Sequence, residues 1–432
     1  MLWKTTLYRN NPTPSAMNRI THYIIIVVSL LAPRLAWGEE QTSISCIDIN
    51  ADTIIFNGAD WSPLFDRLQT LSDSTLTQRE VVSIVHLGDS HVQAGFFSEA
   101  LRLPIQQQWG NAGRGLISPL KLTRTNEPAD YQITSPVKWS YNRCIAGKHF
   151  DSEVGVSGIS VQPTSAHIDL TFQTMSRQGE NEKFCSMRLF HSTSDKFPQL
   201  LPINSLDSIE IDYKCGETHY RWAPNEATNN LQLQGANSYT RKDAAIYGAL
   251  LENDSSGILV HAIGNNSATY ECYNRVTQYA TKLSSLQPHL VIISMGTNES
   301  ISSATTHATL YSQIDRLVTS IKKESPEALI LLTTPADNKL RKRKRRNNRR
   351  SVYYVQNPRI ETVAHTIRQY GADHNIAVWD WYTISGGKDS CETWIKEKGM
   401  RKDHIHYTEE GYSIQGNLLF RSIQNAYEQH IQ

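Results

Sequence analysis

Five short apolar runs, rich in β-branched residues, alternate along the chain with segments whose apolar residues recur at helical spacing. The apolar runs are residues 81–87, 257–263, 290–295, 328–334 and 376–381. The helical segments are residues 93–109, 269–286, 308–323, 357–374 and 409–428. Near-continuous apolar strands that alternate with helices are typical of a parallel sheet with helices on both faces. The pattern predicts an α/β fold with a doubly wound, five-stranded parallel sheet.

Residues 165–253 break this alternation, because they contain no long helical pattern. Short runs of alternating apolar and polar residues, such as 167–172 and 208–213, are separated there by polar turns. Such runs are expected of antiparallel strands in a sandwich. We therefore predict an antiparallel β-sandwich, residues 165–253, inserted into an α/β domain that occupies residues 39–164 and 254–432.

The first 38 residues are expected to form a signal peptide. Lys4, Arg9 and Arg19 precede a largely apolar stretch, residues 23–32, and a small-residue site at residues 36–38. A basic region, a short apolar core and a small-residue cleavage site are typical of secretory signals. The apolar stretch spans about 15 Å as a helix, roughly half of a bilayer core. We expect an exported protein, periplasmic or secreted, without stable insertion into a membrane.

Composition and charge narrow the function classes only slightly. The chain has 432 residues, of which 39% are hydrophobic and 20% charged, and this excludes collagen, a coiled coil and a polytopic membrane protein. The net charge of +1 indicates no partner, and we expect no nucleic acid. Residues 339–350, however, carry nine positive charges and no negative one, so +1 minus nine leaves −8 for the other residues. This run is either a mobile solvated loop or a site that draws an anionic glycan or another polyanion toward the pocket.

Six cysteines are compatible with three disulfides in an exported protein. Six cysteines allow 15 pairings, and the sequence does not choose among them. The sequence contains neither C-x-x-C nor H-E-x-x-H, so we expect no metal site and no cofactor. It makes no prediction of the oligomeric state.

Polar motifs lie at or after the carboxyl ends of the predicted strands. They are Ser90 after the first strand, Gly264 at the end of the second, Gly296 and Asn298 after the third, and Asp403 and His406 ahead of the last helix. Open α/β sheets bind ligands outside the carboxyl ends of their strands, so we expect these residues to converge. Each motif alone is also compatible with an ordinary turn or helix cap. Their common position is the evidence for a site.

The residue types fit nucleophilic catalysis. A serine hydroxyl becomes a nucleophile when a base accepts its proton, and His406 is the predicted base for Ser90. Asp403 is predicted to orient the second ring nitrogen of His406. These three residues form the predicted catalytic triad.

The remaining motif residues are assigned to the oxyanion hole and the substrate pocket. The backbone N–H groups of Ser90 and Gly264 and the side-chain amide of Asn298 are the predicted oxyanion donors. His91 and Gly296 are assigned to the substrate-binding wall. His91 is poorly placed as a base for Ser90, because neighbouring side chains on a helix point about 100° apart. The residues alone predict a serine hydrolase or acyltransferase, and a non-catalytic glycan-binding protein remains the alternative of a different class.

The four blocks resemble those of the SGNH (GDSL) hydrolases. They read Gly88-Asp89-Ser90, Gly264, Gly296-x-Asn298 and Asp403-x-x-His406. Within that family the chain is similar to the periplasmic peptidoglycan O-acetylesterases, which carry a carbohydrate-binding-module-like sandwich after the first block. The resemblance covers about residues 80–160 and 257–432. One departure is Glu299, where many relatives have Asp.

This resemblance implies a flavodoxin-like SGNH fold and a Ser–His–Asp esterase. The implied reaction removes O-acetyl groups from a cell-envelope glycan, peptidoglycan above all, through an acyl-serine intermediate, and the implied partner is the acetylated glycan. An O-acetyltransferase and an acetyl esterase acting on another polysaccharide, such as xylan, remain open alternatives.

Overall fold

The computed structural model describes residues 44–432 with short internal gaps. The residues not described within that range are 74, 76, 147–152, 177, 178, 180, 204, 205, 237–242, 347 and 348. The predicted signal peptide, residues 1–38, lies outside the described residues.

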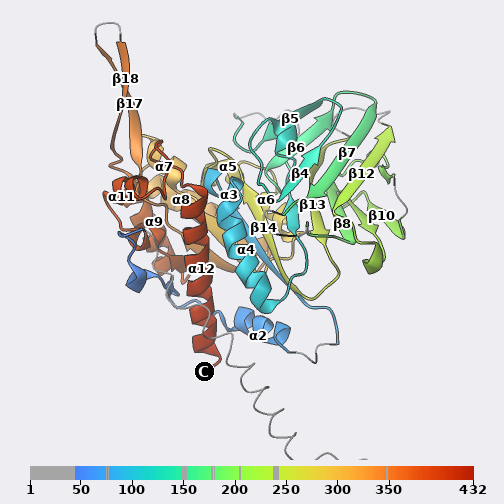
Figure 1. The fold of residues 1–432 in the computed structure, drawn as a ribbon, viewed down its shortest axis with the longest axis horizontal. Coiled ribbons are helices and arrows are strands. Elements are labelled where there is room, and N and C mark those ends of the chain that lie inside the picture. The colour runs from blue at the N-terminus through green and yellow to red at the C-terminus, as the bar shows by residue number, and fades with distance from the viewer. Residues whose placement is uncertain are drawn as a thin grey trace, which may run out of the picture. The chain divides into compact units, whose positions relative to one another are not determined.

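The α/β part contains a six-stranded sheet (Figure 1). Its strands, in spatial order, are β1 (Ile54–Ile55), β19 (Ala377–Trp379), β16 (Leu329–Thr333), β15 (Leu290–Ser294), β2 (Val81–Gly88) and β14 (Gly257–Gly264). Five of them run parallel, and β1 pairs antiparallel with β19. Numbered along the chain, the parallel strands have the order 2-1-3-4-5, which is flavodoxin-like. The doubly wound α/β class is confirmed. The sixth strand, β1, was not predicted, because two residues carry no readable pattern.

Helices cover both faces of this sheet. On one face lie α2 (Ser62–Leu71), α4 (Phe96–Trp109) and α12 (Glu409–His430), and on the other lie α5 (Tyr270–Asn274), α6 (Tyr279–Ser284), α8 (His307–Glu324) and α9 (Ile360–Asp373). Alternate strand residues face opposite cores: Val82 and Ile84 pack in the first, Val85 and Leu87 in the second. The helical segment expected over residues 269–286 is helical but interrupted. It is divided into α5 and α6, and Gln278 before α6 has a left-handed backbone with φ of 53°.

The sandwich consists of two antiparallel sheets that share a core. One holds β3 (Gly115–Ile117), β5 (Trp139–Arg143), β6 (Ile159–Pro163), β8 (Ser186–His191), β10 (Ser208–Asp212), β11 (Glu217–Arg221) and β13 (Ile246–Glu252). The other holds β4 (Tyr131–Thr134), β7 (His167–Thr174), β9 (Leu201–Pro202) and β12 (Asn230–Ala236). Four of these strands, β3 to β6, precede residue 165. We therefore propose that the sandwich extends from about residue 115 to residue 252.

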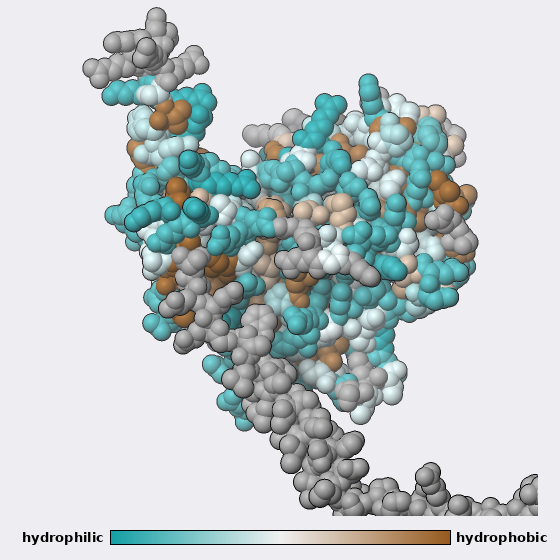
Figure 2. Space-filling view, viewed as in Figure 1, coloured by the Kyte–Doolittle hydropathy of each residue, from teal (hydrophilic) through white to brown (hydrophobic). Residues whose placement is uncertain are grey.

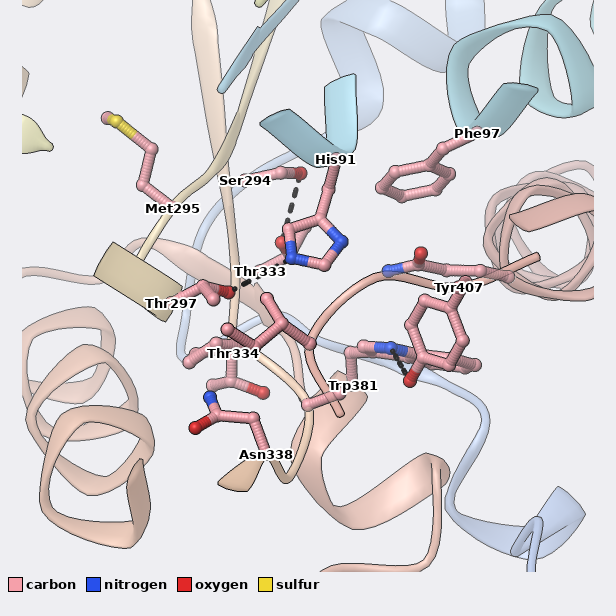
Figure 3. Close-up of a pocket in the computed structure, with 14 residues that line it drawn as sticks. His91, Phe97, Ser294, Met295, Thr297, Thr333, Thr334, Asn338, Trp381 and Tyr407 are labelled. Atoms are coloured by element: carbon pink, nitrogen blue, oxygen red, sulfur yellow. Dashed lines mark hydrogen bonds between the residues drawn. The ribbon is translucent and has the colours of Figure 1, made fainter. Parts of the chain in front are cut away.

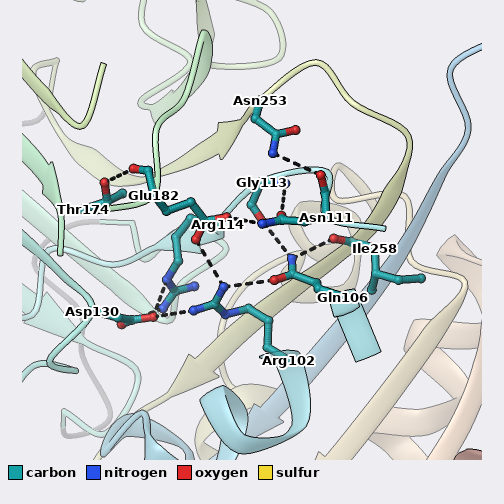
Figure 4. A network of polar contacts seen from close by, with 10 residues as sticks. All are labelled: Arg102, Gln106, Asn111, Gly113, Arg114, Asp130, Thr174, Glu182, Asn253 and Ile258. Carbon is teal, nitrogen blue, oxygen red and sulfur yellow. Dashed lines mark hydrogen bonds and ion pairs between the residues drawn. The ribbon is translucent and has the colours of Figure 1, made fainter. Parts of the chain in front are cut away.

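A buried charged network joins helix α4 to the sandwich (Figure 4). Arg102 of α4 donates to Asp130 Oδ2 at 3.0 Å, and Arg114 donates to Asp130 Oδ1 at 3.1 Å. Gln106, one turn after Arg102, donates to the backbone oxygens of Gly113 and Ile258, each at 2.9 Å. Burial alone would raise the pKa of Asp130, but the two guanidinium groups hold it below its usual value. The carboxylate is therefore ionised and holds the two parts of the chain together.

The basic run forms part of a β-hairpin. β17 (Lys339–Arg346) pairs antiparallel with β18 (Arg349–Gln356), and the hairpin stands out beside α11 (Ser390–Lys396) in Figure 1. The segment is therefore a regular hairpin and not an irregular loop. Its side chains at 341–344 are exposed, as the solvated interpretation expected, because a two-stranded ribbon leaves side chains in water on both faces.

Two further findings bear on the expected compartment and cysteine chemistry. Within the described part of the chain, no helix is long and apolar enough to cross a bilayer. All six cysteines lie among the described residues, and each is a free thiol in this structure.

Candidate active site

Ser90, His406 and Asp403 form a continuous hydrogen-bonded chain. Ser90 Oγ lies 3.0 Å from His406 Nε2, and His406 Nδ1 lies 2.9 Å from Asp403 Oδ2. The serine follows β2 with only Asp89 between them, and the other two residues come from the loop that precedes α12. The structure thus brings together residues more than 300 positions apart in the sequence, at the carboxyl edge of the sheet.

The turn after β2 depends on Gly88 and Asp89. A Cβ atom at Gly88 would lie 2.4 Å from Val92 Cγ2 and 2.7 Å from the backbone oxygen of Ser294, so only glycine fits there. Asp89 is the N-cap of the short helix α3 (Ser90–Gln93), and its Oδ1 accepts from the His91 N–H at 2.9 Å. This geometry places Ser90 at the first position of α3.

The loop before α12 is organised by Asp403. Its Oδ1 accepts from the backbone N–H groups of Ile405 and His406, each at 2.9 Å, while Oδ2 faces the His406 ring. Partial burial alone would raise the pKa of Asp403, but these hydrogen bonds hold it well below its usual range. Asp403 is therefore ionised at neutral pH and fixes the His406 ring from the side opposite Ser90.

The expected oxyanion donors Gly264 and Asn298 are positioned in two different ways, Gly264 by strand pairing and Asn298 by hydrogen bonds of its side chain. Gly264 ends β14 and pairs with Gly88 in the parallel ladder. A Cβ atom at Gly264 would lie 2.1 Å from the backbone nitrogen of Gln93, so glycine permits β14 and α3 to pack. Asn298, in α7 (Thr297–Ile301), donates from Nδ2 to Asp89 Oδ2 at 3.0 Å and to the backbone oxygen of Ala268 at 2.9 Å. Both hydrogens of its amide group are therefore used within the protein.

His91 is partly buried beside His406, with the two ring centroids 5.4 Å apart. Its Nδ1 lies 3.0 Å from Tyr412 Oη and its Nε2 lies 3.4 Å from Thr297 Oγ1. Burial, and then the nearby His406, lower the pKa of His91 to about 3, so its ring is neutral at physiological pH. Ser90 is hydrogen-bonded to His406, whereas His91 is engaged on both ring nitrogens elsewhere.

His91 is one of the residues that line a small pocket (Figure 3). The volume of this pocket is about 30 Å³. The lining residues include His91, Met295, Thr297, Thr334, Trp381, Ile405 and Tyr407. Gly296 is not among the lining residues. It is the N-cap of α7 with φ of 121°, and a Cβ atom there would lie 2.9 Å from Pro335 Cγ.

Two buried carboxyl groups near Ser90 were given no role from the sequence. Asp89 is 1% exposed, and burial raises its pKa to about 7. Glu299 is 2% exposed, and burial, together with the nearby Asp89, raises its pKa to about 7. Glu299 Oε1 accepts from the Tyr270 N–H at 2.8 Å, while Oε2 has no hydrogen-bond partner among the described residues. The motif Gly-Asp-Ser marks Asp89, but no sequence signal shows that it contacts Asn298.

One family model matches the second half of the chain. Residues 227–414 match the model of the GDSL-like lipase/acylhydrolase family. The matched segment includes Gly264, Asn298, Asp403 and His406, whereas Ser90 lies on the far side of the sandwich in the sequence. No curated protein matches the chain.

The solved structures similar to this chain differ greatly in coverage. A structure described as a peptidoglycan O-acetylesterase has 21% sequence identity and a TM-score of 0.70, and the match covers 87% of this chain and 99% of the other. A lipase/acylhydrolase from Enterococcus faecalis has 22% identity and a TM-score of 0.29, over 39% of this chain and 77% of the other. A carbohydrate esterase family 3 protein from Talaromyces cellulolyticus has 11% identity and a TM-score of 0.30, over 39% and 72%. The first of these has a similar fold over most of this chain.

Proposed function

We propose that this chain, a serine esterase of the SGNH (GDSL) type, removes O-acetyl groups from peptidoglycan through an acyl-serine intermediate. The observation that carries the proposal is the hydrogen-bonded chain from Ser90 through His406 to Asp403. The glycan assignment is supported by the likeness in fold to a peptidoglycan O-acetylesterase over 87% of the chain.

The proposed reaction begins with proton transfer from Ser90 Oγ to His406 Nε2. Oγ attacks the acetyl carbonyl carbon, and the tetrahedral intermediate collapses when the sugar oxygen leaves with the proton from His406. Water then attacks the acetyl-serine with His406 again as base, which releases acetate and restores Ser90. Asp403 stays ionised throughout and stabilises the imidazolium.

The proposed oxyanion donors are the backbone N–H groups of Ser90 and Gly264 and the amide of Asn298. Because Asn298 donates to Asp89 and Ala268 in the structure, its donation to an oxyanion requires that one of these two bonds be exchanged. His91 and Gly296 are proposed to shape the wall that receives the substrate. His91 does so from the pocket, and Gly296 does so by fixing the start of α7.

We further propose that residues 1–38 direct export, so that the esterase meets its glycan in the periplasm or outside the cell. The basic and apolar pattern of those residues supports this part of the proposal.

A substrate panel tests the proposed function. Acetate release is measured for the wild type and for Ser90→Ala with O-acetylated peptidoglycan, acetylated xylan and a long-chain ester. We expect the wild type to act best on peptidoglycan and Ser90→Ala to lose several orders of magnitude in rate. Faster release from xylan, or cleavage of the long-chain ester, would contradict the assigned substrate. Transfer of acetyl to an added glycan in place of acetate release would indicate an acetyltransferase, and binding without turnover would indicate a glycan-binding protein.

A further inference from the structure

Positive charge is concentrated in the β17–β18 hairpin. Residues 339–350 contain nine of the 43 lysines and arginines and no acidic residue, while the other residues carry a net charge of −8. A local excess of positive charge on an otherwise acidic chain attracts anions to that segment and not to the rest of the surface. The hairpin is therefore the place where an anionic partner is expected to bind.

Both faces of the hairpin carry exposed cations. Residues opposite each other on antiparallel strands share a face, so Arg341 and Arg343 lie with Tyr354 and Val352, while Lys342 and Lys344 lie with Tyr353 and Ser351. All four basic side chains are exposed. Cations two residues apart on a strand are about 7 Å apart along it. Such rows fit a partner whose negative charges are repeated along its length.

The described side chains of the hairpin form no apolar face of the kind that membrane binding requires. Val352 and Tyr353 are 45% and 46% exposed, but as neighbours on a strand they point to opposite faces. Figure 2 shows mostly hydrophilic side chains on the described part of the hairpin, with isolated hydrophobic ones between them. Elements that lie in a bilayer surface present apolar side chains together on one face. The pattern therefore favours an extended polymer over a lipid surface.

The base of the hairpin is fixed to the loop that carries the catalytic histidine. The Lys339 N–H donates to the His404 backbone oxygen at 3.1 Å, and the Tyr354 ring stacks on the His404 ring with centroids 3.9 Å apart. Lys339 Nζ and His404 Nε2 also contact the same carboxylate, Glu392, the latter at 3.5 Å. His404 lies between Asp403 and His406 in the sequence. A polymer held along the hairpin therefore lies close to the loop of the active site.

We propose that the β17–β18 hairpin binds an anionic glycan strand and presents it to the Ser90 site. The guanidinium and ammonium groups pair with carboxylates or phosphates of the strand, and the exposed Tyr353 ring offers a face for a sugar ring. The proposal rests on the proposed function in one respect, namely that the partner is a glycan.

A binding measurement with two charge-matched variants tests this proposal. The first variant combines Arg341→Gln, Lys342→Gln, Arg343→Gln and Lys344→Gln. The control combines Arg67→Gln, Lys323→Gln, Lys388→Gln and Lys396→Gln, four exposed cations elsewhere on the chain. The full chain is titrated at low salt with polygalacturonate, with neutral dextran and with phosphatidylglycerol vesicles. Equal thermal unfolding midpoints verify that both variants are folded.

We expect the wild type and the control to bind polygalacturonate and not dextran, and the hairpin variant to bind it at least tenfold more weakly. Binding should also weaken as salt screens the charges. Equal affinity of the two variants, or equal binding of dextran, would overturn the proposal, and tighter binding to the vesicles would replace the glycan by a membrane. Binding of polygalacturonate can be measured independently of catalysis, because this polymer contains no acetyl ester. If the chain binds polygalacturonate but hydrolyses no acetyl ester, the proposed function is contradicted and the binding role of the hairpin is not.

Discussion

At the scale of single residues, two buried carboxyl groups lie near Ser90. Asp89 and Glu299 are both almost fully buried, and both have a pKa of about 7 in the folded protein because of burial. A carboxyl group whose pKa is raised on folding binds more protons in the folded than in the unfolded state between about pH 4 and 7. Its contribution to the free energy of unfolding is therefore fully present below the unfolded pKa and is lost as the pH rises through 7.

We expect Glu299→Gln to reduce this pH dependence. The amide cannot ionise, so the loss of stability between pH 4 and 7 should shrink by as much as about 3 kcal/mol. The free energy of unfolding is measured by urea denaturation at several pH values, with Glu327→Gln, an exposed glutamate, as the control. An unchanged slope against pH in Glu299→Gln would contradict the raised pKa.

The orienting role proposed for Asp403 makes a separate prediction. Asp403→Asn should keep the shape of the loop but lose the charge that fixes the His406 ring, because Oδ2 faces Nδ1 at 2.9 Å. The turnover number for a small acetyl ester should fall by about 10³- to 10⁴-fold with little change in KM. Steady-state kinetics measure both quantities. Full turnover in the variant would exclude Asp403 from the mechanism.

The sequence predicted that these residues converge, but not the contacts that hold each of them. Ser90, Asp403 and His406 were expected to lie together because the strand order brings their motifs to one edge of the sheet. The bonds from Asn298 to Asp89 and Ala268 depend on side-chain rotamers and on the packing of α7, which no periodicity encodes. The oxyanion assignment of Asn298 therefore stays a prediction.

At the scale of elements, long and regular patterns were predicted well and short ones were missed. Four of the parallel strands, β2, β14, β15 and β16, have five to eight residues that are mostly apolar and buried, so their pattern is clear. The fifth, β19, has only three residues, but it lies within the predicted run of residues 376–381. Strands such as β3, with three residues, are defined by pairing with β13 and not by their own sequence. The secondary structure of the basic run was ambiguous because charged residues are common in loops. The strand that pairs with it contains Val352, Tyr353 and Tyr354, which favour strands.

The network between α4 and the sandwich gives a prediction at this scale. Asp130→Ala would leave the buried guanidinium groups of Arg102 and Arg114 without their shared carboxylate. We expect the free energy of unfolding to fall by about 3 to 5 kcal/mol. Chemical denaturation measures the change, and Asp207→Ala, an exposed aspartate, serves as the control. A loss below about 1 kcal/mol would show that the network does not hold the two parts together.

At the scale of the whole molecule, the sandwich is continuous with the α/β part. Leu116, Tyr247 and Leu250 of the sandwich strands are buried in the same core as Val85 and Ile293 of the central sheet. Removal of the insert would open that core, so the two parts are expected to unfold together. This coupling was not predictable from the sequence, because the hydrophobic pattern shows which residues are buried but not which core receives them.

Calorimetry tests the coupling between the two parts. We expect a single unfolding transition whose calorimetric and van't Hoff enthalpies agree. The matched comparison is Asp130→Ala, which weakens the contact between the parts and should broaden or divide the transition. Two separate transitions in the wild type would contradict a shared core.

The central claim is that Ser90 is the nucleophile of an SGNH-type serine esterase. The most direct measurement is covalent labelling with a fluorophosphonate, followed by mass spectrometry of the modified peptide and an assay of acetyl ester hydrolysis. The account predicts one label on Ser90 of the wild type, loss of hydrolysis in proportion to labelling, and no label at that position in Ser90→Ala. Loss of hydrolysis with the label on another residue and Ser90 unmodified would contradict it.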